Sequence, residues 1–351
     1  MTIFCLVFST FTIDVAYTII AGVDYAYPIY KLHIICIIFI LYYLSFSDKR
    51  FHLNISKLLK NATIGMFIIC FYQQMVAMHL LPTISFMPVR YIYENLSLIT
   101  GGFGNPNNQA VLSLLVALSY ALLLKNRRAP VKYFPIVYLL NFFIVVVTTS
   151  RTVLVLYVLL SFFFILSLKF KYKSSIILAI IAFIILGFIF IKPDANDLFV
   201  SRMLMKISTI TTSGDSDESL GVRGAAYLYF IKNFIFYPIG FGPGNYGDFY
   251  EKSTFFVDNP YFAESPHSFI FEIYLAYGAI SIVGLIMLIL IAIHTQLTIR
   301  WTMFFYSIFI ICSFVPSSIL KMPCVFFLLL LPIVINQRRE YENSHRLFKH
   351  N

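Results

Sequence analysis

Charged side chains are scarce in this sequence, which excludes an ordinary soluble domain. Aspartate, glutamate, lysine and arginine together make up 12% of the 351 residues, about half of the roughly 25% that is usual in soluble domains. Hydrophobic residues make up 60%, and they recur in apolar runs of about 18 to 22 residues, the length of a helix that crosses a bilayer. The sequence therefore predicts an all-α integral membrane protein.

The polar part of the sequence contains no cysteine, which argues against a disulfide framework or a zinc site. All five cysteines lie inside apolar runs, where they are expected to pack as small hydrophobic side chains. The glycine-rich segment 240–245 also lacks the Gly-Lys-Ser/Thr ending of a nucleotide-binding loop. We therefore expect no metal and no cofactor.

A continuous basic surface is missing too, although the net charge is +10. The lysines and arginines fall in short clusters between apolar runs, near residues 48–60, 125–132, 169–173 and 338–349. Cytoplasmic loops of membrane proteins have this distribution. A bilayer is therefore the expected partner, and no nucleic acid is expected.

Placing every basic cluster on the cytoplasmic side predicts about ten transmembrane helices with both termini inside. The whole chain, residues 1–351, is then a single polytopic membrane domain. The expected spans lie at about 2–20, 28–47, 61–81, 107–124, 133–150, 152–169, 174–191, 267–295, 301–315 and 322–336.

This topology brings the unusual polar segments to one face, the outer face. They are residues 103–107 (FGNPN), residues 148–152 (TTSRT) and a long loop, residues 192–266. A connection of about 75 residues is longer than a passive loop needs and suggests a binding or catalytic element. Apolar residues at helical spacing near 220–236 predict an interfacial helix within the loop.

Three side chains on this face are candidates for chemistry. Arg151 lies in a hairpin at the membrane edge, where it either serves function or reaches toward lipid headgroups. Arg223 begins the predicted loop helix, where a headgroup contact is the alternative. Two arginines suit a diphosphate, because guanidinium groups pair with phosphate oxygens and stay charged.

His267 is the third candidate. We expect Ser265 to be the N-cap of the following helix, Pro266 to take its first position and His267 to lie in its first turn. An imidazole has an unperturbed pKa of about 6.5, so it can accept a proton near neutral pH. A histidine that only caps the helix is an equally good interpretation.

Four motifs in order resemble the O-antigen ligase/polymerase superfamily of bacterial membrane proteins, which includes the Wzy-type polymerases. They are FGNPN at 103–107, TSRT at 149–152, GVR at 221–223 leading to the glycine-rich 238–245, and HSFIFE at 267–272 running into YGAI at 277–280. The resemblance covers about residues 95–295.

The resemblance implies a glycosyltransferase-C-like fold in a bacterial cytoplasmic membrane. It also implies metal-independent transfer of a glycan from undecaprenyl diphosphate to a sugar hydroxyl on the outer face. By the same resemblance Arg151 and Arg223 hold the diphosphate, and His267 is the base that activates the acceptor. Substrate-binding residues are expected at Asn105, Asn107, Tyr227, Gly242, Asn245 and Ser268.

Two positions depart from the family pattern. Ser268 stands where the family often has asparagine, and Tyr227 is nearest to where it often has tryptophan. The implied partners are the undecaprenyl-diphosphate-linked oligosaccharide together with a flippase and a chain-length regulator of the same pathway.

Repeat-unit polymerase is the favoured function, because the chain is compact and its Asn-Pro-Asn motif resembles that branch. The alternative is a ligase that transfers finished glycan to lipid A-core. A transporter or flippase of the lipid-linked oligosaccharide is the alternative of another class. It would place polar residues in several spans and use discontinuous helices, and neither feature is evident in the sequence.

Overall fold

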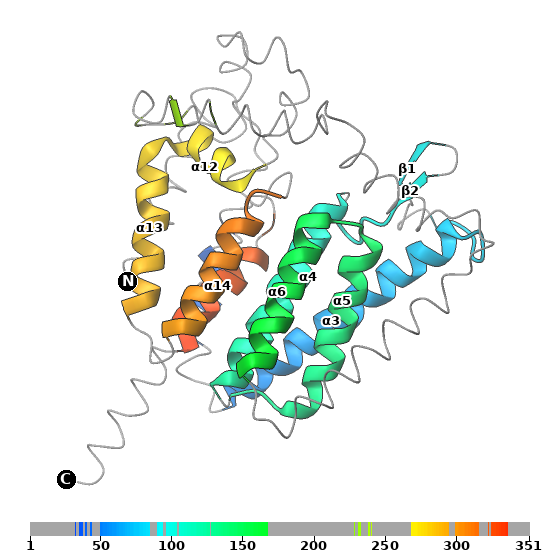
Figure 1. Cartoon of the computed structure of the whole chain (residues 1–351), viewed down its shortest axis with the longest axis horizontal. Coiled ribbons are helices and arrows are strands. Elements are labelled where there is room, and N and C mark those ends of the chain that lie inside the picture. Colours follow the sequence, from blue (N-terminus) through cyan, green and yellow to red (C-terminus); the bar gives the residue numbers. More distant parts are fainter. Residues whose placement is uncertain are drawn as a thin grey trace. The chain divides into compact units, whose positions relative to one another are not determined.

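The computed structural model describes residues 50–84, 90–93, 96–103, 105–126, 128–167, 268–294, 299–315 and 324–335. It also describes single positions between 32 and 43 and between 228 and 240, and Met322. The chain divides into two compact units, residues Leu53–Asp217 and residues Met1–His52 with Glu218–Asn351. We call them the central unit and the terminal unit and describe each by itself (Figure 1).

Helices of the central unit form a bundle. They are α3 (Phe51–Ala77), α4 (Pro106–Lys125), α5 (Phe134–Val147) and α6 (Arg151–Ser167), with a short 3-10 helix, η1 (Val131–Tyr133), before α5. Helix α4 packs against both α5 and α6. Because short connections reverse the chain on either side of α5, α4 and α6 run parallel and α5 runs antiparallel to both.

Helix α4 is the core of this bundle. Every residue from Asn108 to Leu123 is buried, as expected for a helix that is apolar on all sides. Its start is well specified, because Asn105 is the N-cap and Pro106 takes the first helical position, where a missing N–H costs nothing.

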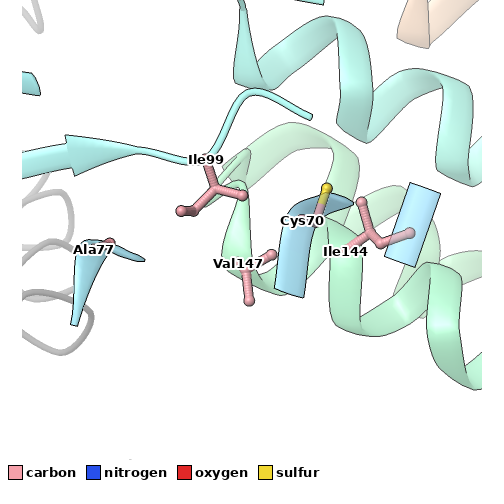
Figure 2. Close-up of a cluster of buried hydrophobic side chains, with 5 residues drawn as sticks. All are labelled: Cys70, Ala77, Ile99, Ile144 and Val147. Carbon is pink, nitrogen blue, oxygen red and sulfur yellow. The ribbon is translucent and has the colours of Figure 1, made fainter. Parts of the chain in front are cut away.

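A cluster of buried apolar side chains fixes one end of the bundle. Cys70 and Ala77 of α3 meet Ile144 and Val147 of α5, and Ile99 enters from the segment that precedes α4 (Figure 2). The ends of α3 and α5 and the approach to α4 are therefore held together.

A small antiparallel strand pair precedes α4 and was not predicted. Strand β1 (Arg90–Tyr93) pairs with β2 (Leu96–Leu98), with Arg90 opposite Leu98 and an irregularity between Tyr91 and Tyr93. The described part of the chain is otherwise mostly helical, as the sequence predicted.

The terminal unit contains α12 (Phe269–Tyr277), α13 (Ala279–His294), α14 (Ile299–Cys312) and a further helix, Cys324–Ile335. The phenol of Tyr306 in α14 donates a hydrogen bond of 2.9 Å to the Leu329 carbonyl of that last helix. The Phe269 ring of α12 makes edge contacts with the rings of Phe309 and Phe326. These contacts join three helices of the unit.

The span predicted at 267–295 is wrong as a single helix. Gly278 has φ 74° and ψ −166°, a conformation that only glycine adopts readily, and it separates α12 from α13. Within the described residues, α12 and α13 thus form a discontinuous helix, which the sequence did not make evident.

Other predicted spans agree with the structure to different degrees. Helices α4, α5 and α6, with α14 and Cys324–Ile335, coincide with the spans predicted near 107–124, 133–150, 152–169, 301–315 and 322–336. Helix α3 begins ten residues earlier than expected. Of the described helices, α3 and α4 are long and apolar enough to cross a membrane, and the others of this kind are shorter. The spans at 2–20 and 174–191 lie outside the described residues.

Candidate functional site

The turn between α5 and α6 places Arg151 at the first position of α6. Helix α5 ends with hydrogen bonds from Thr148 N to Ile144 O and from Thr149 N to Val146 O, each 3.0 Å long. Helix α6 begins when Ser150 O accepts from Leu154 N at 2.9 Å. Three buried residues, Thr148, Thr149 and Ser150, therefore make the whole connection.

Thr149 carries backbone strain in this turn. Its φ is 54°, in the left-handed region that β-branched residues rarely adopt, at a cost of roughly 1–3 kcal/mol. Strain of this kind persists where the surrounding structure enforces it, and it is frequent at functional sites. The tight turn fixes the backbone of half-buried Arg151 at the end of the bundle.

The electrostatics at Arg151 favour an anion. A cation at a helix N-terminus is repelled by the partial positive charge of the first N–H groups, by about 0.3–1 kcal/mol. Helix α4 runs parallel to α6 and packs against it, so it directs its own positive end toward the same end of the bundle. An anion at this end would interact favourably with the guanidinium and with the N–H groups of the helix N-termini.

The predicted residues of the FGNPN motif lie at this same end. The side-chain oxygen of Asn105 accepts a hydrogen bond from Asn107 N at 2.9 Å, so Asn105 caps α4. Asn107 is half-buried in the first turn of the helix. Asn105 therefore has a structural function whatever else it does.

Sequence reasoning missed Gln73 of α3, which holds the segment before this motif. Its side-chain oxygen accepts from Thr100 N at 3.1 Å and from Gly101 N at 2.8 Å, and its amide donates to Gly101 O at 3.2 Å. The signal in the sequence was a pair of glutamines, Gln73 and Gln74, inside an apolar span.

The opposite end of the central unit carries basic residues. The ammonium groups of Lys60 and Lys132 lie 5.0 and 5.2 Å from the centre of the Tyr133 ring, within the range of cation–π attraction. Within this unit these two lysines lie at the other end of the helices from the FGNPN and TTSRT motifs.

In the terminal unit the helix start differs from the prediction, because Ser268 and not Ser265 is the N-cap. The hydroxyl of Ser268 accepts from Phe271 N at 3.4 Å, and Ser313 O accepts from Phe269 N at 2.8 Å. These bonds occupy N–H groups that an anion would need. Ser268 is itself buried, so its hydroxyl serves the cap.

The glycine-rich loop meets the break between α12 and α13. Pro238 O accepts from Ile280 N at 3.4 Å. A Cβ atom on Gly240 would overlap the backbone of Ala276 and Tyr277, and one on Gly278 would overlap Pro238. Two motifs that are about 40 residues apart in the sequence thus pack backbone against backbone, which requires glycine at both positions.

Glu272 is a second residue that sequence reasoning did not single out. It lies one turn into α12 and only 1% of its surface is exposed. A carboxylate at this depth needs partners that compensate for lost hydration. Its burial makes it part of the interior of the terminal unit.

The remaining predicted residues lie outside the described part of the chain. They are His267, Arg223, Tyr227, Gly242 and Asn245. Most of the predicted loop, 192–266, lies outside it as well, although Leu228, Ile231 and Lys232 are described, helical and exposed. Among the residues that are described, no group of three or more His, Cys, Asp or Glu side chains is placed to hold a metal ion.

Comparison with known proteins gives one finding. Residues 136–289 match the model of a family described as O-antigen ligase, which confirms the resemblance inferred from the motifs. The match includes the α5–α6 turn and the 192–266 loop but not the FGNPN motif. No curated protein matches the chain, and no solved structure does.

Proposed function

We propose that this chain, which carries a domain of the O-antigen ligase type, polymerises the repeat units of a bacterial surface polysaccharide. The family implies a glycosyltransferase-like enzyme that acts in O-antigen ligation or polymerisation. The proposal adds the donor, a glycan on undecaprenyl diphosphate, and the acceptor, a sugar hydroxyl of another lipid-linked repeat unit. It also adds the outer face of the cytoplasmic membrane as the place of reaction.

The strained turn that presents Arg151 is the observation that carries this proposal. Thr149 holds a left-handed backbone conformation two residues before Arg151, which is the first residue of α6. The arginine is placed where the helix dipole opposes its charge. The backbone strain at Thr149 and the repulsion between Arg151 and the helix dipole are both explained if the turn binds a diphosphate. A guanidinium and helix N–H groups are suitable ligands for phosphate oxygens.

The proposed reaction assigns a separate task to each predicted residue. His267 accepts the proton of the acceptor hydroxyl, whose oxygen forms a bond to the anomeric carbon of the donor sugar. The bond between that carbon and the diphosphate oxygen breaks, and undecaprenyl diphosphate leaves with both electrons. Arg151 and Arg223 stabilise the negative charge that develops on the leaving group.

The acceptor separates polymerase from ligase. A ligase would use lipid A-core in place of a second lipid-linked repeat unit. We favour the polymerase because the Asn105-Pro106-Asn107 motif resembles that branch, and this motif forms the start of the central helix α4.

A lipid-linked oligosaccharide flippase is supported by one observation, the discontinuous helix at Gly278. Transporters use such breaks at their binding sites. The family match to O-antigen ligases favours the enzyme, because a flippase breaks no covalent bond.

Complementation of a deletion strain of the source organism tests the proposal. The strain would express wild type, Arg151→Ala, Arg151→Lys, Arg223→Ala or His267→Ala at matched levels, and its surface glycan would be separated on a gel. Cells without the gene should show core that carries a single repeat unit. The three alanine variants should reproduce that pattern. Arg151→Lys should restore the full ladder only poorly, because lysine cannot pair bidentately with phosphate oxygens.

Three other results would each change the conclusion. Long chains that accumulate on the lipid carrier, with none on the core, would identify a ligase. Loss of lipid-linked repeat units from the outer face would identify a flippase. A full ladder in the alanine variants would refute the assignment of these residues.

A further inference from the structure

Gln73 joins α3 to the backbone that leads into the FGNPN motif. Three hydrogen bonds of its side chain go to Thr100 and Gly101, and the residue is 99% buried. Gly101 has φ 60°, and a Cβ atom there would overlap the side chain of Gln109 in α4. Gly101 is therefore enclosed by two glutamines, one from α3 and one from α4. We call Gln73, Thr100, Gly101 and Gln109 the glutamine junction.

The junction is continuous with the base of the Arg151 turn. Ile99 adjoins Thr100 and packs against Val147, the last residue of α5 before the turn (Figure 2). Cys70 and Ala77 lie one turn before and one turn after Gln73 on α3 and belong to the same cluster. A shift of the 99–101 segment would therefore change the packing of Val147 at the base of the turn.

We propose that Gln73 is a positioning residue for the diphosphate site, acting through the glutamine junction on the placement of Arg151 and of the first turn of α4. This inference rests on the proposed function, because it assumes that Arg151 binds the diphosphate. Gln73 does not touch the substrate. It sets the distance between the start of α4 and the start of α6, whose N–H groups face the same end of the bundle.

The central unit offers a matched control for stability. Asn141 of α5 is completely buried and donates to Thr63 of α3 at 2.9 Å and to Val137 O at 2.7 Å. Like Gln73, it is a buried amide that joins α3 to another element. It lies about two turns of α5 before the Arg151 turn, so removing it should weaken the bundle and leave the site in place.

Binding of undecaprenyl diphosphate to the full-length purified protein in nanodiscs is the test. This ligand carries no sugar, so the assay does not depend on the identity of the repeat unit. The dissociation constant would be measured for wild type, Gln73→Leu, Asn141→Leu and Arg151→Ala, together with the melting temperature of each. Loss of folded protein lowers the number of sites but leaves the dissociation constant unchanged, which separates stability from positioning.

We expect Gln73→Leu to weaken binding roughly tenfold, the effect of losing one or two well-placed hydrogen bonds, and Arg151→Ala to weaken it at least as much. Asn141→Leu should melt earlier and bind within about twofold of wild type. Should Gln73→Leu fail to fold, Gln73→Met replaces it. Methionine has nearly the length of glutamine and makes none of the three hydrogen bonds, so a similar loss of affinity is expected.

Wild-type affinity in the Gln73 variants, with weakened binding in Arg151→Ala, would overturn this inference and leave the proposed diphosphate site intact. Wild-type affinity in Arg151→Ala would overturn the assignment of Arg151 and this inference with it. Equal losses in Gln73→Leu and Asn141→Leu would show that any loosening of the bundle weakens binding, which would also overturn the positioning role.

Discussion

Replacing Gly278 by alanine should destabilise the terminal unit strongly, and the structure gives the magnitude. Alanine in a backbone conformation with φ 74° and ψ −166° costs roughly 1–3 kcal/mol. The new methyl group would also overlap the carbonyl of Pro238 and displace it from Ile280 N, which removes a hydrogen bond worth about 0.5–1.5 kcal/mol. The expected loss is about 2–4 kcal/mol, or a melting temperature lower by on the order of 5–10 °C.

Gly65→Ala is the matched control, because the same substitution should have the opposite effect there. A Cβ atom on Gly65 meets nothing within 4 Å, and the residue lies in the interior of α3. Alanine should therefore stabilise that helix by about 0.5–1 kcal/mol.

Buried thiols provide the assay. Cys70 and Cys312 are both buried. In a protein that keeps only one of these two cysteines, with the others replaced by serine, a dye that fluoresces on reaction with thiols reports unfolding around that cysteine. Gly278→Ala should lower the temperature at which Cys312 reacts, and Gly65→Ala should raise that of Cys70. Equal melting temperatures for Gly278→Ala and wild type would refute the argument that the helix break requires glycine.

Two further predictions concern the polar end of the central unit. Thr149→Gly should raise the melting temperature, since it relieves a left-handed backbone that costs roughly 1–3 kcal/mol, and it should leave the glycan ladder unchanged. A lower melting temperature would mean that contacts of the threonine side chain outweigh the strain. Asn105→Ala should destabilise α4 by about 0.5–2 kcal/mol, whereas Asn105→Asp keeps the cap. If the aspartate variant is as stable as wild type but produces no ladder, Asn105 contacts substrate as well.

Helix positions were predictable where an apolar run is bounded by residues that typically start or end a helix. Helix α4 could be placed within one residue at each end, because Asn105 and Pro106 mark its start and Lys125 its end. Helix α3 was placed too late, since the basic residues near its start were assigned to a loop. Phe51, Ile55 and Leu59 are all buried, and their four-residue spacing is the helical signal that this assignment overlooked.

Features that depend on contacts between distant segments could not be predicted in the same way. Tyr277-Gly278 looks like a permissible interruption of one long apolar helix, and only the packing of Pro238 and Gly240 against it explains the break. Ser265 was predicted as the N-cap, and the bond from Phe269 N to Ser313 O favours the later start at Ser268. The place of Arg151 at a tight hairpin could be predicted, because a charge between two apolar spans is conspicuous in the sequence. The contacts of Gln73 could not, because they are made with backbone groups of a distant segment.

The length of α3 has a consequence for the membrane around the protein. Its 27 residues extend for about 40 Å at 1.5 Å per residue, while the 20 residues of α4 extend for about 30 Å, close to the thickness of the hydrocarbon layer. Helix α3 is the longest of the described helices, so it must tilt or project beyond the layer. Lipids with longer or shorter acyl chains would change the tilt of α3. Because Gln73 lies near the end of α3, a change in tilt would shift the glutamine junction. Acyl-chain length thereby becomes a variable to which diphosphate affinity should respond, with no ligand other than the bilayer itself.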